Sequence, residues 1–216
     1  MEPTRIDLDT WPRREHFEHY LRKVPCDYAL TTEIDVTAAV EAQRAAYRKT
    51  YPAQIWALAA AVNRHEAFRM TLTEDGRPAV WPRLDPAFTV FNPETETFCC
   101  VTTPFDEDFG RFHDAVVDLL ETHHESTAMF PQGPLPPHCF DVSGVPWTSF
   151  TGFTLQIRGG GEHLLPIFTI GRRIRRDDRI VLPLAIQVHH AAADGFHTGR
   201  LIREIRALAG NPSWLG

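Results

Sequence analysis

Two adjacent histidines and an aspartate stand in the segment Val188–Gly195, whose sequence is VHHAAADG. A neutral imidazole can accept a proton from a hydroxyl group when its second nitrogen is held as N–H. We predict that His190 is such a general base, because it directly precedes the loop and stands four positions before Asp194. His189 points to the opposite face of an extended strand, and we expect it to be packed. The alternative is that Asp194 only caps the next helix and that both histidines are ordinary buried residues.

This segment is predicted to join a buried strand to an amphipathic helix. Ile180–Val188 is a short apolar run, which is typical of a buried strand. From Gly195 onward, apolar residues recur at helical spacing, namely Leu201, Ile202, Ile205, Leu208 and Ala209. A side chain at the end of a strand is held rigidly by the sheet and can still face a cleft, as a catalytic group requires.

No nucleophile motif accompanies the predicted base. Ser149 lacks the Gly-x-Ser-x-Gly turn that exposes a catalytic serine, and no cysteine has a recognisable activating neighbour. The sequence therefore favours direct attack by a substrate hydroxyl over a covalent acyl-enzyme. A zinc site built from His189, His190 and His197 is an alternative, but its spacing matches no known ligand pattern, so we expect no metal.

The composition is that of one soluble globular domain, which we expect to span residues 1–216. Hydrophobic residues make up 43% of the chain and charged residues 23%. No apolar run reaches the roughly 18 residues that a membrane span needs, and the first residues lack the order of a secretion signal. We therefore expect a cytoplasmic protein that does not bind membranes.

The charge of the chain argues against nucleic-acid binding, and the spacing of its cysteines argues against Cys-x-x-Cys motifs. The net charge of −6 provides no basic surface for nucleic acid. None of the four cysteines forms a Cys-x-x-Cys pair, and we expect free thiols at Cys26, Cys99, Cys100 and Cys139.

Five arginines gather within eight positions of this acidic chain. They are either a solvated hairpin tip, balanced in part by Asp177 and Asp178, or a contact surface for the phosphates of a carrier such as coenzyme A. The five residues are Arg172, Arg173, Arg175, Arg176 and Arg179.

The remaining pattern predicts an α+β fold, with a mixed β-sheet flanked by helices. Helices are expected at residues 13–21, 37–49, 53–63 (with Pro52 in its first turn) and 106–125, the last being the longest. Strands are expected at 28–34, 88–91, 97–102, 150–157, 165–174 and 179–190, a hairpin at 69–81, and a loop at 130–137.

The chain resembles the trimeric, histidine-dependent chloramphenicol acetyltransferases from about Ile6 to Ala209. The histidine motif alone is less specific, because lipoamide acyltransferase cores and peptide-synthetase condensation domains carry a similar one. The resemblance extends, in the family's order, to Trp11–Phe17, Tyr51-Pro52, Phe88–Phe91, Glu94–Phe98, Phe130–Gly133, Ser143–Trp147 and Gln187–His197.

This resemblance implies a two-layer sandwich of the coenzyme A-dependent acyltransferase type. It also implies acetyl transfer from acetyl-coenzyme A to a hydroxyl of chloramphenicol, which confers antibiotic resistance, in a homotrimer with active sites at subunit interfaces. His190 is then the base, Ser143 donates to the tetrahedral oxyanion, and Thr169 assists through water. Asp194 matches an aspartate that pairs with an arginine, here Arg13, to keep the base loop in place.

The resemblance also implies two binding regions. An apolar drug pocket maps to Tyr20, Cys26, Tyr28, Phe98, Phe130, Leu155 and Ile167, and the coenzyme to Trp147, Arg172 and Arg173. For any single apolar residue of this set, the alternative is that it fills the core. The chain departs from the family pattern at Ala193, where a cysteine is common, at Asp141, where an asparagine is common, and at Arg172-Arg173, where lysine and an aromatic residue often stand.

Two other functions stay open from the sequence. One is the catalytic core of a lipoamide acyltransferase, which uses a similar histidine. The other is a non-catalytic small-molecule binder that keeps the fold.

Overall fold

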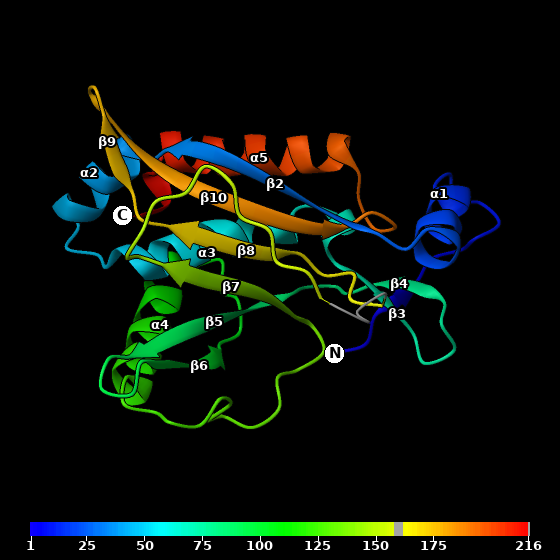
Figure 1. Cartoon of the computed structure of the whole chain (residues 1–216), viewed down its shortest axis with the longest axis horizontal. Coiled ribbons are helices and arrows are strands. Elements are labelled where there is room, and N and C mark those ends of the chain that lie inside the picture. Colours follow the sequence, from blue (N-terminus) through cyan, green and yellow to red (C-terminus); the bar gives the residue numbers. More distant parts are fainter. Residues whose placement is uncertain (158–161, 216) are drawn as a thin grey trace.

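A mixed β-sheet forms the centre of the computed structural model, which describes residues 1–157 and 162–215. The strand order is β2-β10-β8-β7-β5-β6, and β9 pairs with part of β10 (Figure 1). β7 is parallel to both β5 and β8, and the other neighbours are antiparallel. The strands are β2 (Asp27–Asp35), β5 (Asp85–Asn92), β6 (Thr97–Thr102), β7 (Cys139–Val145), β8 (Ile167–Gly171), β9 (Ile174–Arg176) and β10 (Arg179–His189).

Helices cover one face of this sheet, which confirms the predicted α+β class. They are α2 (Thr37–Ala45), α3 (Thr50–Asn63), α4 (Phe109–His123) and α5 (Gly195–Gly210), and Figure 1 shows α3, α4 and α5 behind the sheet. Phe88, Phe140 and Phe168 are fully buried between the layers. Because side chains alternate along a strand, the residues next to them point away from the helices. We call this second side the open face.

The N-terminal elements lie at the end of the sheet where β10 ends (Figure 1). α1 (Arg14–Glu18) continues into a short π-helix (His19–Lys23), and a separate small sheet has the order β1-β4-β3. Its strands are β1 (Thr4–Arg5), β3 (Met70–Leu72) and β4 (Pro78–Val80), and short 3-10 helices occur at Glu66–Phe68 and Ser213–Leu215. The segment that follows His189 therefore meets residues from the start of the chain.

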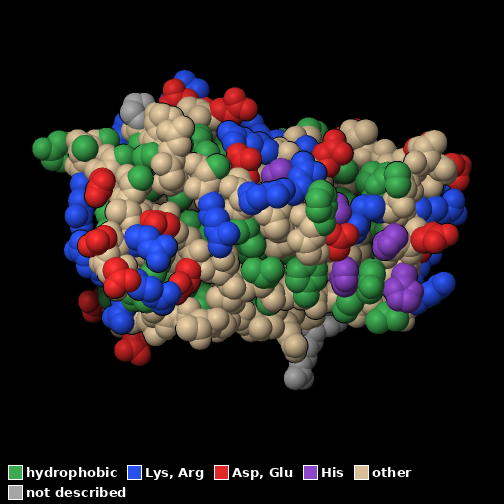
Figure 2. Space-filling view, turned by 90° about the horizontal axis from the view of Figure 1, so that it is seen from above, with side chains coloured by type: hydrophobic (Ala, Val, Ile, Leu, Met, Phe, Trp, Pro, Cys, Tyr) green, Lys and Arg blue, Asp and Glu red, His purple; other side chains and the backbone are tan. Residues whose placement is uncertain are grey.

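α5 has the amphipathic character that its sequence predicts. Its five predicted core residues are buried, whereas Arg200, Arg203 and Arg206 are exposed. Figure 2 views the molecule from the α5 side and shows Lys and Arg side chains gathered along the middle of this face. In the described residues, no helix is long and apolar enough to cross a membrane.

One predicted strand is wrong. Residues 150–157 form no strand, and Figure 1 shows this segment crossing the open face over β8 and β10 instead of pairing along them. Its backbone contacts the sheet through the amide of Phe153, which donates to Thr31 Oγ1 at 3.2 Å. Phe150 packs so closely that a Cβ at Gly171 would lie 2.7 Å from its ring. The apolar residues of this segment pack against the open face of the sheet, and its backbone does not pair with a strand.

Other elements also differ from the sequence prediction. β7 falls in a stretch for which we predicted no strand, and the strand expected at 165–174 is interrupted after Gly171. α4 begins at Phe109, because the Asp108 side chain accepts from the amide of Arg111 as an N-cap. With 15 residues α4 is one shorter than α5, so it is not the longest helix.

Candidate active site

His190 lies immediately after β10 and is half-buried, so its ring is not sealed inside the protein. Its amide donates to the carbonyl of Cys26 at 2.9 Å. The imidazole stacks on Tyr20, with ring centroids 3.9 Å apart and planes 10° from parallel, and the ring of Tyr28 meets it edge-on at 5.4 Å. Two aromatic rings therefore fix the orientation of the imidazole.

The tautomer of His190 is not fixed in the way that the sequence analysis supposed. Its Nδ1 is buried, and among the described residues no acceptor holds it. Because Nδ1 is covered, Nε2 is the nitrogen that can face a substrate. Packing, and not a hydrogen bond from another residue, positions this ring.

Asp194 holds the loop after His190 through three contacts. Its carboxylate accepts from Arg13 Nη1 at 2.6 Å, from the amide of Phe196 at 3.0 Å and from His197 Nδ1 at 2.8 Å. Burial alone would raise the pKa of Asp194, but the hydrogen bonds from His197 and Arg13 outweigh it and hold that pKa well below its usual range. Asp194 is thus charged at neutral pH and ties the base loop to the start of α1.

Two residues of this cluster were missed as positioning residues by the sequence analysis. His197 donates from Nδ1 to the Asp194 carboxylate, and its place three positions after Asp194 could have suggested this contact. Thr198 is fully buried, and its hydroxyl lies 2.5 Å from that of Tyr28 and 3.3 Å from the carbonyl of Asp194. No local pattern predicts a contact between residues 170 positions apart.

The other two histidines of the zinc alternative have structural contacts. His189 is buried, and its Nδ1 accepts from the amide of Ala191 at 3.1 Å. His197 is engaged with Asp194, as described above. Within residues 1–157 and 162–215, no three His, Cys, Asp or Glu side chains are grouped as metal ligands. All four cysteines are free.

Ser143 and Thr169 face each other across the parallel strands β7 and β8. Both lie on the open face, since their neighbours Val142 and Phe168 belong to the core behind the sheet. Ser143 is half-buried and Thr169 buried. The two hydroxyl groups are therefore neighbours on the open face.

Ser143 and His190 do not meet within one chain. Thr169 stands opposite Ala185 of β10, five residues before His190. At about 3.3 Å per residue this is a separation of about 16 Å along the strand. The structure thus divides the predicted site into a base half around His190 and an acyl half around Ser143.

A groove of about 540 Å³ adjoins the acyl half. It is lined by all three residues that the resemblance assigned to the coenzyme, namely Trp147, Arg172 and Arg173. The exposed Trp147 ring packs against Phe91 at 4.7 Å. Tyr51, which the sequence analysis did not assign, also lines the groove, and burial raises its pKa to about 12. The groove thus combines aromatic rings with two guanidinium groups.

The seven predicted drug-pocket residues fall into different places. Tyr20, Cys26 and Tyr28 surround His190. Ile167 is buried beside the acyl half, opposite Asp141. The other three, Phe98, Phe130 and Leu155, are between 42% and 49% exposed, so they do not fill the core of this chain.

The departures from the family pattern have different environments. Ala193 is fully buried in the core. Asp141 is half-buried two residues from Ser143, burial raises its pKa, and His163 Nε2 lies 3.9 Å from its carboxylate. In the cluster of five arginines, Arg176 Nη1 pairs with the Glu33 carboxylate at 2.5 Å and not with Asp177 or Asp178. Arg172 and Arg173, at the start of the cluster, line the groove.

Replacing Asp194 with Asn keeps a good N-cap but removes the charge that binds Arg13. We expect the free energy of unfolding at pH 7 to fall by about 1–2 kcal/mol, the value for a buried pair discounted for partial exposure. The pKa of Asp194 is lower in the folded protein than its unfolded value of 3.8, so the charged carboxylate stabilises the fold above pH 3.8. The difference in the free energy of unfolding between wild type and Asp194→Asn should therefore shrink as the pH falls below 3.8. Urea unfolding of the two proteins measures this difference in the free energy of unfolding. The matched control is Glu18→Gln, which removes the exposed Arg14–Glu18 pair and should change stability by at most about 0.5 kcal/mol. Equal stability of Asp194→Asn and wild type would contradict a holding role.

Comparison with known proteins gives one consistent family. The family model described as chloramphenicol acetyltransferase matches residues 1–206. A chloramphenicol acetyltransferase of Streptomyces acrimycini is 62% identical over 213 residues, covering 99% of this chain and 97% of the relative. A solved chloramphenicol acetyltransferase superposes with a TM-score of 0.85 at 23% identity, over 95% of this chain and 99% of that one. A dihydrolipoamide acetyltransferase of Azotobacter vinelandii superposes with a TM-score of 0.70 at 15% identity, over 93% and 88%, and shares the fold.

Proposed function

The chain belongs to the chloramphenicol acetyltransferase family and is an acyltransferase, and on this premise we propose that it transfers the acetyl group of acetyl-coenzyme A to a hydroxyl of chloramphenicol. Acetylation of the drug would make the host resistant to it. The observation that carries this proposal is the imidazole of His190, half-buried, oriented between Tyr20 and Tyr28, and followed by a loop that Arg13 and Asp194 hold.

The reaction follows from the chemistry of the two half-sites. His190 Nε2 accepts the proton of the drug hydroxyl while the hydroxyl oxygen attacks the thioester carbonyl. The Ser143 hydroxyl donates to the oxyanion of the tetrahedral intermediate, and Thr169 assists from the facing strand. The intermediate collapses with cleavage of the carbon–sulfur bond, and the imidazolium returns its proton to the departing thiolate. The products are the acetyl ester and free coenzyme A, and the enzyme is regenerated.

We propose that two subunits of a homotrimer build each site. The separation of about 16 Å between the base half and the acyl half supports this, because a base and an oxyanion donor must act on the same carbonyl. The exposed Phe98, Phe130 and Leu155 support it further, since apolar side chains at an interface lose contact with water. A neighbouring His190 placed over Ser143 would complete the site.

The groove beside Ser143 suits acetyl-coenzyme A. Arg172 and Arg173 can form charge-assisted bonds to its phosphates, and the indole of Trp147 offers a flat apolar surface to the rest of the molecule. The Arg172 amide donates to the carbonyl of Thr148 at 2.8 Å, which holds the backbone from which its side chain extends.

Replacing Trp147 with Ala should raise the KM for acetyl-coenzyme A about tenfold and leave kcat nearly unchanged. A stacking surface worth about 1–3 kcal/mol stabilises the bound ground state and the transition state equally. Steady-state kinetics with the coenzyme varied at saturating drug measures this. Tyr47→Ala, which removes an aromatic ring that is 95% exposed outside the groove, should match wild type. A lower kcat with the wild-type KM would contradict the assignment.

The proposed function is tested by following thiol release from acetyl-coenzyme A with the purified protein and chloramphenicol. We expect thiol release that depends on both substrates, together with the mass of an acetylated drug. Release with dihydrolipoamide but not with chloramphenicol would favour the lipoamide acyltransferase alternative. Saturable binding of the drug without any turnover would favour a non-catalytic binder.

Two further expectations belong to this proposal. We propose that residues 1–216 form a single acyltransferase domain, for which one cooperative unfolding transition is the expected result. The cytoplasmic location also stays a prediction, and it agrees with the cellular site of acetyl-coenzyme A.

A further inference from the structure

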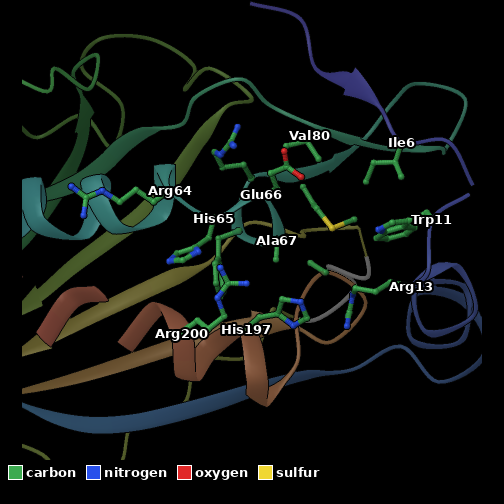
Figure 3. A pocket seen from close by; sticks show the side chains of 14 residues that line it. Ile6, Trp11, Arg13, Arg64, His65, Glu66, Ala67, Val80, His197 and Arg200 are labelled. Carbon is green, nitrogen blue, oxygen red and sulfur yellow. The ribbon is translucent and has the colours of Figure 1, made fainter. Parts of the chain in front are cut away.

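A pocket of about 470 Å³ lies between the N-terminal segment, the turn after α3, β4 and the start of α5. In Figure 3, Ile6 and Trp11 lie on one side of it and Arg64 and Arg200 on the other, with the rings of His65 and His197 between them. None of its lining residues is Ser143, His190 or a ring that contacts His190. The pocket is therefore distinct from the space around His190 and from the groove beside Ser143, but it shares Arg13, Ala192 and His197 with the base loop and its contacts.

The side formed by Ile6 and Trp11 is apolar. Met70 and Val80 of the small sheet and Ala192 of the base loop complete this side. Trp11 is half-buried, and its ring packs on Phe17 with centroids 5.4 Å apart. This surface can take a flat apolar body, such as an aromatic ring.

The opposite side carries an excess of positive charge. Four arginines line the pocket, whereas Glu66 is the one acidic residue in the described lining. Arg64 pairs with Glu204 and Arg13 with Asp194. In the part of the chain that the structure describes, neither Arg69 nor Arg200 forms an ion pair with a carboxylate.

Arg69 and Arg200 have weaker contacts instead. Arg69 Nη1 donates to the carbonyls of Trp81 and Pro82, and the guanidinium of Arg200 lies 5.8 Å from the ring of Phe196. Neither guanidinium is therefore neutralised by a directly paired carboxylate, although Glu66 lies near enough to act on the charge of Arg69.

The pocket wall also contains N–H groups that no protein acceptor uses. Arg13 Nε and Arg69 Nε are buried and have no hydrogen-bond partner among the described residues. Burying such groups unpaired costs about 1–3 kcal/mol each. An anion that these side chains turn toward would recover part of this cost.

We propose that this pocket binds a small organic anion, a carboxylate or phosphate monoester carried on an aromatic ring, with the ring on Trp11 and the charge at Arg69 and Arg200. Arg13 connects the pocket to the base loop. Its side chain lines the cavity, and its Nη1 donates to the Asp194 carboxylate at 2.6 Å. A bound anion competes with Asp194 for this guanidinium and loosens the loop that carries His190. Occupancy of the pocket therefore lowers kcat.

Isothermal titration calorimetry of the whole protein with phenyl phosphate tests the site without relying on activity, so failure of this inference is distinguishable from failure of the proposed function. We expect saturable binding at constant ionic strength. The dissociation constant should be about tenfold higher in Arg200→Gln, because one charge-assisted contact is lost. Arg203→Gln, an exposed arginine one turn along α5 and outside the pocket, is the matched control and should bind like wild type. Benzoate in place of phenyl phosphate shows which head group is preferred, and phenol, which is neutral, should not bind.

Three results would overturn the inference. One is the absence of saturable binding of phenyl phosphate and benzoate. Another is binding that Arg173→Gln abolishes and Arg200→Gln leaves intact, because the anion would then occupy the groove beside Ser143. The third is a kcat of acetyl transfer that saturating phenyl phosphate leaves unchanged, because the pocket would then have no link to the base loop. A lower kcat at saturating levels of both substrates would support that link.

Discussion

Replacing His190 with Ala lowers kcat for acetyl transfer by about 10² to 10⁴, the range that a positioned general base contributes. The drug hydroxyl must lose its proton as it attacks, and His190 is the described imidazole that contacts both Tyr20 and Tyr28, whereas His19 contacts Tyr20 alone. The KM of either substrate should change little, since the imidazole acts in the transition state. Thiol release at saturating drug and coenzyme measures the effect.

The control for this experiment separates chemistry from folding. His16→Ala removes an exposed histidine of α1 and should leave both kcat and thermal stability at wild-type values. His190→Ala should also unfold close to the wild-type temperature, because the ring is half-buried and makes no side-chain hydrogen bond. A His190→Ala protein that keeps its fold and the full wild-type kcat would contradict the role of this residue.

The sequence predicted the elements that hold His190 because their patterns are periodic. The apolar run of β10 and the helical spacing of α5 each match a single kind of element. β7 was missed because Pro136-Pro137 precede it and Gly144 and Pro146 stand at its end, so that turn residues obscure the alternation of Phe140 and Val142. The opposite error arose at 150–157, since apolar residues that pack across a sheet resemble those that pair within it.

The contacts of the candidate site depend on separations that no local pattern encodes. Arg13 and Asp194 are 181 positions apart, and only the resemblance to a family brought them together before the structure did. The same holds for the facing positions of Ser143 and Thr169, which depend on the parallel pairing of β7 with β8. The separation of Ser143 from His190 requires the register of three strands, and before the structure only the resemblance, which implies sites at subunit interfaces, pointed to a divided site.

Replacing Ser143 with Ala should reduce kcat by about 10² to 10³ with little change in KM, as for other single oxyanion donors worth about 3 kcal/mol. The hydroxyl lies on the open face, and the next residue, Gly144, lines the groove. Ser149→Ala, a second half-buried serine that follows Trp147 by two positions and is not in the lining of the groove, is the matched control and should retain wild-type activity. Unchanged turnover of Ser143→Ala would mean that another group donates to the oxyanion.

The two inactive variants also test whether one site draws on two subunits. If each site takes His190 from one subunit and Ser143 from the next, every mixed trimer of His190→Ala and Ser143→Ala chains contains one site with both residues intact. Random assembly of equal amounts makes three quarters of the trimers mixed, so activity should recover to about one quarter of wild type. Co-refolding the denatured variants and measuring thiol release gives this value, with each variant refolded alone as the control. A site contained within one chain gives no recovery on mixing, because no chain then carries both intact residues.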